Sequence, residues 1–374
     1  MRKPAFDLRK ASHFLIILTL VGLLLFFAKT IILPLLFAVI FSLILDPICS
    51  FFQKYLRWRW LAILATFLAI FIPVSIGIFL FTYQLKGAVE DYSLITERLE
   101  VAINEGFAWI NQYVPISRKK GLDYISENLT SIIDQPFDMI SASISASTSF
   151  VSNFFLVLLY SFFFLYYKAG ITSFLLQQSS KKHRESAANL LSQIKNITQD
   201  YLLGLGTVML ILGILNSVGL MVIGIDYAFF WGFLAAFLAV IPYIGTFIGG
   251  FLPFLYALAV TDSQWQPLAV IGLFVLVQTL EGNFITPKVV GDNISINPFT
   301  AILGLIIGGS LWGIAGMVLA LPLLAIFKVV CDHVPALQPV GFLISNDLFD
   351  KPETFLKNWD SDRFRLFSLF RERQ

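Results

Sequence analysis

A group of polar residues interrupts an apolar stretch toward the C-terminal end of the chain. The segment QTLEGNFITPKVVGDN contains Gln278, Glu281, Asn283, Thr286 and Lys288. Polar side chains are costly inside a membrane, so those that occur there are functional candidates. A carboxylate beside a helix break could take up a proton or a cation, which makes Glu281 the leading candidate. The alternative is that Glu281 lies at the water interface and pairs with Lys288. We predict that these five residues line or gate a transport path.

A second candidate segment, AVIPYIGTFIGGFLP, combines polar groups with residues that disturb a helix. Pro242 lacks a backbone N–H donor, and Tyr243 adds a hydroxyl to the predicted path. Irregular backbone at membrane depth is tolerated only where it is buried in protein or lines a cavity. Paired interrupted segments point to a transporter's binding site, whereas an ordinary kinked packing helix is the alternative. The expected helix breaks are Pro242, Gly245, Pro253, Gly282, Pro287, Gly313, Gly316 and Pro322.

The residues that usually carry catalysis or bind metals are few and scattered. The histidines are His13, His183 and His333, the cysteines are Cys49 and Cys331, and none of these pairs has the spacing of metal ligands. The sequence contains no phosphate-binding loop, so no ATP-driven step is expected. A net charge of +2 gives no reason to expect a nucleic-acid partner. We therefore predict no enzymatic activity, no cofactor and no metal site.

The composition is that of a membrane protein. Hydrophobic residues make up 57% of the 374 residues and charged residues 13%, against about 45–50% and about 25% in soluble domains. About eight uncharged stretches approach the roughly 20 apolar residues that a membrane-spanning helix needs. They are uniformly apolar, which favours helices over alternating barrel strands. We predict an all-α integral membrane protein with about eight transmembrane helices. The stretches cover residues 14–28, 30–45, 60–85, 139–167, 201–225, 227–261, 263–280 and 293–327.

The two longest stretches, residues 227–261 and 293–327, are too long for one straight membrane-spanning helix. Both are rich in glycine and proline. Each could be a long tilted helix, a broken helix or a tight hairpin, and we predict broken helices in this half of the chain.

Near the other end of the chain, Asp46 and Pro47 are expected to stop the second span at the cytoplasmic surface.

Basic residues indicate which span ends face the cytoplasm. Short cytoplasmic loops are enriched in Lys and Arg, and such residues gather in the N-terminal arm, after the second span and after the fourth span. With about eight spans, both termini are then cytoplasmic. Residues 86–138 fall on the opposite face and have apolar positions at helical spacing, which predicts an extracytoplasmic amphipathic hairpin. It either packs on the bundle, or gates the outer mouth or contacts a neighbouring subunit.

The predicted organisation has consecutive parts. They are a three-span membrane unit (1–85), the extracytoplasmic helical segment (86–138), the fourth span with a cytoplasmic amphipathic helix (139–200), a C-terminal membrane transport core (201–331) and a cytoplasmic tail (332–374).

The C-terminal half also resembles a known family. The stretches IPYIGTFIGGFLP, QTLEGNFITPKVVGDNISINPF and LGLIIGGSLWGIAGMVLALPLLAI look like the signature half of the autoinducer-2 exporter family of bacterial permeases. DYLLG at Asp200 and the Asp-Pro pair at Asp46 are similar to it too. The resemblance implies a multi-pass protein of the bacterial cytoplasmic (inner) membrane that forms a homo-oligomer such as a pentamer. The motif positions it implies are Pro242, Tyr243, Gly245, Glu281, Gly282, Asn283, Pro287, Pro298, Gly313, Gly316 and Pro322.

The sequence leaves three functions open. The first is a secondary transporter that exports a small polar molecule, which the family name suggests could be autoinducer-2. The second is a sodium(lithium)/proton antiporter that uses Glu281 as the exchanging carboxylate, because the resemblance implies this activity for some family members. The third is a non-transporting oligomeric membrane scaffold. The expected partners are membrane lipids, the transported solute or ion, and further copies of the chain.

Overall fold

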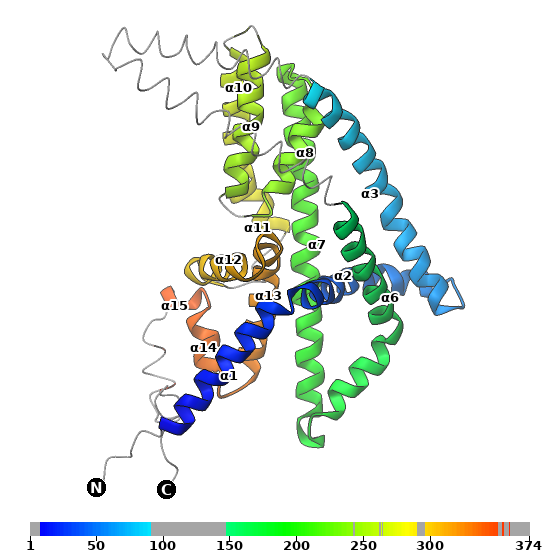
Figure 1. The fold of residues 1–374 in the computed structure, drawn as a ribbon, viewed down its shortest axis with the longest axis vertical. Helices are drawn as coiled ribbons and strands as arrows, with labels where there is room; N and C mark the ends of the chain where they lie inside the picture. The colour runs from blue at the N-terminus through cyan, green and yellow to red at the C-terminus, as the bar shows by residue number, and fades with distance from the viewer. Residues whose placement is uncertain are drawn as a thin grey trace. The chain divides into compact units, whose positions relative to one another are not determined.

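The computed structural model describes residues 8–90, 147–241, 244–261, 263, 265–289, 296–350, 354 and 359. Within these residues the regular structure is helical, and the only β interaction is an isolated antiparallel bridge between Ile296 and Ser345. Figure 1 shows these helices along the chain, and the predicted all-α class is confirmed. The predicted extracytoplasmic hairpin lies outside the described residues from position 91 onward.

The helices follow one another with short connections in the described segments. In chain order they are α1 (Leu8–Phe27), α2 (Lys29–Gln53), α3 (Arg59–Glu90), α6 (Ser147–Gln177), the 3₁₀ turn η1 (Lys181–His183), α7 (Arg184–Ile223), α8 (Ala228–Leu238), α9 (Ile244–Val260), α10 (Trp265–Leu280), the π-helical segment η2 (Glu281–Ile285), α11 (Thr286–Val289), α12 (Pro298–Trp312), α13 (Ile314–His333), α14 (Gln338–Leu343) and α15 (Asp347–Asp350).

Many of these helices match the length and apolarity of membrane spans. In the described part of the chain, 6 helices are long and apolar enough to cross a membrane. They cover Lys29–Gln53, Arg59–Gly87, Ser152–Gln177, Lys181–Ile223, Trp265–Val289 and Ile314–His333. Shorter apolar helices include α8, α9 and α12. The chain is therefore a multi-pass membrane protein, and the figure of about eight crossings stays a prediction.

The two longest apolar stretches both contain a pair of helices. Residues 227–261 hold α8 and α9, and residues 293–327 hold α12 and the first part of α13. Gly313 ends α12 with φ of 63°, a value that favours glycine, and α13 begins at the next residue. Of the three arrangements considered for each stretch, the structure shows the hairpin.

The chain is built from two compact units that each combine separate segments. Unit 1 consists of Met1–Thr66, Phe154–Leu203 and Gly291–Gln374, and unit 2 consists of Phe67–Asn153 and Gly204–Val290. The long helices α3 and α7 contribute residues to both units. The consecutive parts expected from the sequence follow different boundaries and stay a prediction.

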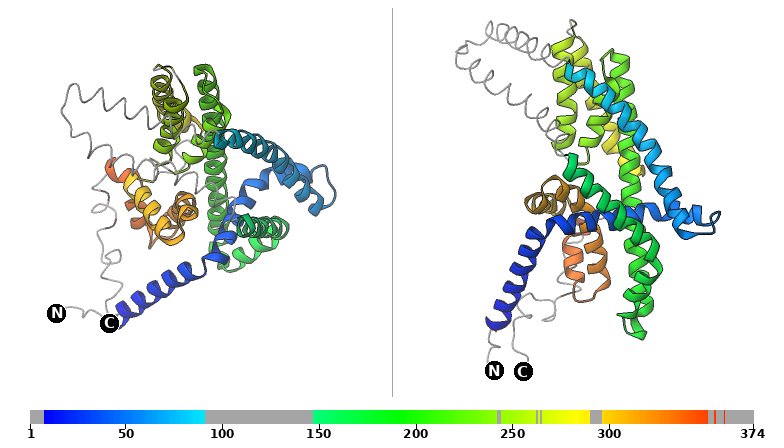
Figure 2. Two further views of the ribbon diagram at one scale, coloured as in Figure 1. Left: turned by 45° about the horizontal axis from the view of Figure 1, so that its top comes forward. Right: turned by 45° about the vertical axis from the view of Figure 1, so that its right-hand side comes forward.

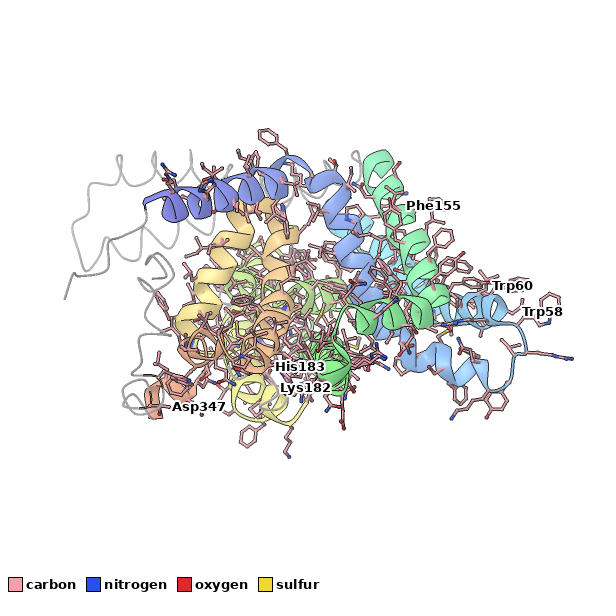
Figure 3. All side chains as sticks on the ribbon, turned by 90° about the horizontal axis from the view of Figure 1, so that it is seen from below. Trp58, Trp60, Phe155, Lys182, His183 and Asp347 are labelled. Atoms are coloured by element: carbon pink, nitrogen blue, oxygen red, sulfur yellow. The ribbon has the colours of Figure 1, made fainter. Side chains whose placement is uncertain are left out.

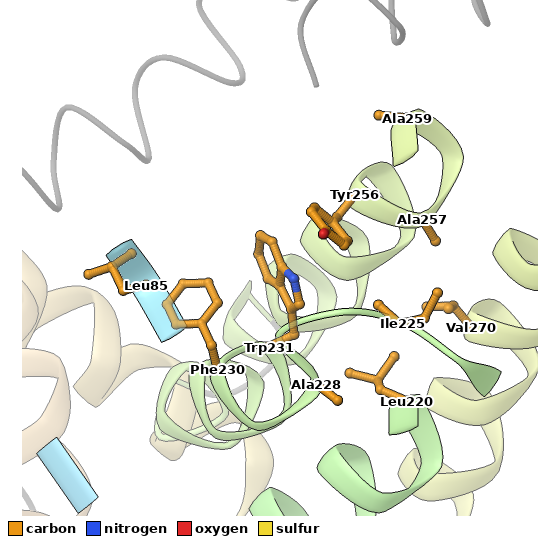
Figure 4. Close-up of a cluster of buried hydrophobic side chains, with 10 residues drawn as sticks. All are labelled: Leu85, Leu220, Ile225, Ala228, Phe230, Trp231, Tyr256, Ala257, Ala259 and Val270. Atoms are coloured by element: carbon orange, nitrogen blue, oxygen red, sulfur yellow. The ribbon is translucent and has the colours of Figure 1, made fainter. Parts of the chain in front are cut away.

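Unit 2 has an aromatic core. Phe230, Trp231 and Tyr256 are buried there with small and aliphatic side chains of α3, α7, α9 and α10. Figure 4 shows these side chains pointing toward one another from several helices. The Trp231 and Tyr256 ring centroids lie 5.3 Å apart, a separation typical of stabilising aromatic pairs. This core fixes α8 and α9 beside α10, which carries the polar segment.

In unit 2, side chains form hydrogen bonds with backbone groups at the ends of helices. The first amides of a helix lack partners within the helix, and Gln84 Oε1 accepts a hydrogen bond from the Phe230 amide at 2.8 Å. At the end of α7, Gln266 Nε2 donates to the Ile223 carbonyl at 3.0 Å. These contacts attach α3 to α8 and α10 to α7.

Unit 1 is fastened by polar contacts at both ends of the α12–α13 hairpin. Asn297 caps α12 by accepting from the Thr300 amide, and its Nδ2 donates to the carbonyls of Leu343 and Ser345. At the other end of α12, Trp312 Nε1 donates to the Leu25 carbonyl of α1 at 2.9 Å. Between these ends, Gly308 and Gly316 approach so closely that a Cβ on either would meet backbone of the other.

One expectation about a helix boundary was wrong. Pro47 does not stop the second span, because α2 continues through it to Gln53. A side chain from another helix, described below, occupies the carbonyl that Pro47 leaves without a donor. Helix α7 runs without interruption from Arg184 to Ile223, so the segment predicted as a cytoplasmic amphipathic helix continues into the predicted transport core. Its cytoplasmic position stays a prediction.

The turns of unit 1 carry residues typical of a membrane surface. Trp58 and Trp60 lie together before and at the start of α3, with ring centroids 5.8 Å apart. Figure 3 labels Trp58 and Trp60 close to each other, and it labels Lys182 and His183, which belong to the turn between α6 and α7. Tryptophan at the interface and basic residues in short turns are features of membrane protein boundaries. The two views in Figure 2 show the turn between α2 and α3 at the end of both helices.

Candidate transport site

The polar segment begins where α10 ends. Residues Glu281–Ile285 form the π-helical segment η2, in which the Thr286 amide donates to the Glu281 carbonyl five residues earlier. Pro287 favours this change, because it has no amide to donate to the carbonyl of Asn283. Single π turns within helices occur frequently at functional sites. The predicted disturbance near Gly282 and Pro287 is therefore a widened turn between α10 and α11 rather than a complete break.

Glu281 is held by neutral hydrogen-bond donors on both sides. Gln278 Nε2 donates to Glu281 Oε2 at 2.7 Å, and Thr286 Oγ1 donates to Oε1 at 2.6 Å. The glutamate itself is half-buried. The spacings of three and five residues place these donors on either side of Glu281 because the π turn brings position 286 back toward it. The result is an oriented carboxylate in the polar segment that follows the apolar helix α10.

The other predicted residues of this segment lie outside the carboxylate's contacts. Asn283 Nδ2 donates to the Thr279 carbonyl at 2.9 Å, and both Asn283 and Lys288 are exposed. Among the described residues, the contacts of Glu281 are with Gln278 and Thr286, and no ion pair joins it to Lys288. The structure thus brings together three of the five predicted residues, and a role for any of them stays a prediction.

The second predicted segment is only partly described. Pro242 and Tyr243 lie outside the described residues. Gly245 is inside α9, where a Cβ would meet the Leu238 backbone of α8. Gly249 of α9 likewise faces Ala235 of α8. In this hairpin the glycines allow close packing of two helices.

Three of the expected helix breaks lie within continuous helices. Pro253 is enclosed in α9, and Gly316 and Pro322 are enclosed in α13. Prolines are tolerated in membrane helices because neighbouring groups and local adjustments satisfy the freed carbonyls. Gly313 does separate two helices.

Sequence reasoning missed a charged cluster in unit 1. Asp46 of α2 contacts Lys168 of α6 and Lys195 of α7, each at 2.6 Å. The Asp46 side chain is 8% exposed. The available signal was an acid on an apolar helix, but the adjacent Pro47 suggested a helix end instead. Its lysine partners are remote in sequence, so spacing could not identify them.

Within the described ranges, no group of three or more His, Cys, Asp or Glu side chains could hold a metal ion.

An apolar helical bundle with an oriented carboxylate at a widened helix turn has the features of a membrane transport protein. The chain belongs to the AI-2E transporter family: the family's sequence model, described as AI-2E family transporter, matches residues 14–336. The resemblance inferred from the motifs is confirmed, and so is the function of membrane transport.

Relatives agree with this assignment over most of the chain. The "Putative transport protein YueF" of Bacillus subtilis (strain 168) is 30% identical over 318 residues, covering 81% of this chain and 84% of that protein. The "AI-2 transport protein TqsA" of Escherichia coli (strain K12) is 26% identical over 322 residues, covering 86% of this chain and 91% of that protein. A bacterial family of multi-pass proteins implies the inner membrane.

Proposed function

We propose that this transporter exports a small polar molecule along a path that includes Glu281, and that it performs no chemistry on its substrate. The observation that carries the proposal is the contact of Glu281 with Gln278 and Thr286 at the π-helical turn. Polar side chains in membrane helices cost free energy, so those that are present usually have a function. We include Asn283, Lys288 and Tyr243 in the same path because they lie in the two polar segments of the sequence.

Autoinducer-2 is the first substrate to test. One relative is named as an AI-2 transport protein, and the substrate of this chain is a proposal that follows from that name. Autoinducer-2 is polar and carries hydroxyl groups, so hydrogen bonds to the Glu281 carboxylate could bind it. Purified protein in liposomes loaded with autoinducer-2 is expected to release it faster than protein-free liposomes.

The role of Glu281 is tested with a matched pair of variants. Glu281→Ala removes the carboxylate and is expected to slow autoinducer-2 release by about tenfold or more, the effect of losing about 1.4 kcal/mol of interaction. Thr82→Val removes an exposed hydroxyl that, in the described part of the chain, donates to the Ile78 carbonyl of the same helix, and its release rate is expected to match the unmodified protein. Equal release by Glu281→Ala and the unmodified protein would remove Glu281 from the path.

Cation/proton antiport is the second candidate, favoured by the neutral partners of Glu281. Its donors, Gln278 and Thr286, are neutral, so no described side chain places a cation on the Glu281 carboxylate, which leaves it able to bind an exchanged cation. Liposomes containing a trapped pH dye would show alkalinisation or acidification when a sodium or lithium gradient is applied. Proton flux that depends on Glu281, without autoinducer-2 release, would select antiport over export.

We further propose the arrangement of the protein in the membrane. Both termini lie in the cytoplasm, as the basic turns of unit 1 favour. The transporter forms a homo-oligomer, and a pentamer is the form expected from the family resemblance. Cross-linking of the protein in native membranes, followed by mass determination, would measure the number of copies.

A further inference from the structure

The charged cluster of unit 1 connects three helices. Lys168 Nζ of α6 donates to both Asp46 carboxylate oxygens at 2.6 Å. Lys195 Nζ of α7 lies 2.6 Å from Asp46 Oδ2. The lysine side chains are 42% and 36% exposed, whereas that of Asp46 is 8% exposed. The nearly buried carboxylate of Asp46 therefore forms ion pairs with two partly exposed ammonium groups.

Charge neutrality requires only one of the two lysines. The second adds an excess positive charge, and the cost of desolvation makes a buried ion pair a weak source of stability. The presence of Lys195 beside Lys168 therefore calls for an explanation other than stability.

Helices α6 and α7 also contact α2 at separate points. Ser161 Oγ of α6 donates to the Ala38 carbonyl at 3.2 Å. Gln199 Nε2 of α7 donates to the Leu43 carbonyl at 2.6 Å. Pro47 has no amide for that carbonyl, four residues earlier, so Gln199 supplies the missing donor. Each helix thus has its own docking point on α2, and both share Asp46.

We propose that Asp46 is a shared counter-ion that lets α6 and α7 separate from α2 one at a time. When α6 moves away, Lys195 keeps the carboxylate paired, and when α7 moves away, Lys168 does. With one lysine, one of these movements would leave a buried carboxylate without a cation, which is strongly destabilising. Each departing lysine can extend its ammonium group to water, because its side chain is already partly exposed.

Separation of α6 or α7 from α2 would change the local conformation of the transporter while Asp46 keeps one lysine partner. Transport requires a protein to pass between conformations, and closely packed helices that change partners are one way to do so. The proposal concerns unit 1 alone and does not depend on Glu281 or on the identity of the substrate. It can therefore fail while the proposed export function stands, and the reverse is also true.

Cross-linking can report the two docking points separately. The chain has only the cysteines Cys49 and Cys331, so Cys49→Ala with Cys331→Ala provides a cysteine-free background. The pair Ala38→Cys and Ser161→Cys then reports contact between α2 and α6. Oxidation by copper phenanthroline in native membranes forms the disulfide. A maleimide mass tag then modifies the remaining free thiols, and the gel shift measures the cross-linked fraction.

The second reporter follows contact between α2 and α7. It consists of Leu43→Cys with Gln199→Cys in the same background. With Asp46 and both lysines in place, each reporter pair is expected to cross-link. The reporters replace the donors Ser161 and Gln199, so cross-linking measures how close the helices lie. A parent protein that cross-links at neither pair would contradict the proximity of α6 and α7 to α2 on which the proposal rests.

The lysines are then substituted one at a time. Lys168→Met is expected to lower cross-linking between α2 and α6 by about two- to fivefold, as expected for loss of a partly exposed ion pair. It is not expected to lower cross-linking between α2 and α7, because Lys195 is then the only lysine that pairs with Asp46. Lys195→Met is expected to do the reverse. Asp46→Asn is expected to lower both. Lys54→Met, on the exposed turn after α2, is the matched control and should change neither.

A charge-conserving variant separates electrostatics from misfolding. Lys168→Arg is expected to restore the cross-linking that Lys168→Met loses, because it keeps the positive charge. A rigid cluster would instead lose both cross-links with either single substitution, and that result would overturn the proposal. Unchanged cross-linking in all charge variants, or no rescue by Lys168→Arg, would overturn it as well.

Discussion

At the scale of single residues, Asn297 illustrates how one buried side chain can organise a chain segment. The residue is 2% exposed, and its side chain satisfies the Thr300 amide and two carbonyls near α14. Asn297→Ala would leave these backbone groups without their partner. We expect the free energy of unfolding to fall by about 2–3 kcal/mol, measured by denaturation of the detergent-solubilised protein.

Asn283→Ala is the control for this residue prediction. Asn283 is exposed and hydrogen-bonds only to its own helix in the described chain. Its loss is expected to change the free energy of unfolding by less than about 0.5 kcal/mol. Equal destabilisation by the two substitutions would contradict the role assigned to Asn297.

At the scale of helices, the contact between α7 and the proline turn of α2 can be tested by a double-mutant cycle. Gln199→Leu removes the donor to the Leu43 carbonyl and is expected to cost about 1–3 kcal/mol, because a partly buried acceptor is left unsatisfied. In a Pro47→Ala background the restored backbone N–H satisfies this carbonyl. Gln199→Leu should then cost clearly less, and an identical cost in both backgrounds would show that the two sites are independent.

Close packing of α12 and α13 is a second prediction about helices. Gly316→Val places a side chain against the backbone of Gly308 and is expected to destabilise the protein by about 1–3 kcal/mol, as overpacking does. Gly170→Val introduces the same side chain in α6, where nothing lies within 4 Å of the new Cβ. Thermal unfolding in detergent should show the larger loss for Gly316→Val, and comparable losses would argue against a tight crossing.

At the scale of the whole molecule, the predicted orientation can be measured with cysteine labelling. Tyr55→Cys, placed on the exposed turn after α2, is expected to react with a membrane-impermeant maleimide only from the cytoplasmic side. Ser126→Cys, in the predicted extracytoplasmic segment, should react only from outside. Both variants are made in the Cys49→Ala/Cys331→Ala background, and labelling of both from one side would refute the orientation.

The sequence determined the class of this protein more readily than its internal contacts. Uncharged stretches predicted a helical membrane protein because the backbone must satisfy its own hydrogen bonds in lipid. The neighbours of Glu281 were also predictable, since Gln278 and Thr286 are local in sequence. Asp46 was not, because Lys168 lies 122 positions away. Stretch length alone could not distinguish the α8–α9 and α12–α13 hairpins from broken helices.

Release of autoinducer-2 from proteoliposomes tests the central claim that this family member exports a small polar solute past Glu281. The account predicts release by the unmodified protein and by Thr82→Val, with release by Glu281→Ala about tenfold slower or more. Equal release by Glu281→Ala and Thr82→Val, with all proteins reconstituted to the same level, would contradict it.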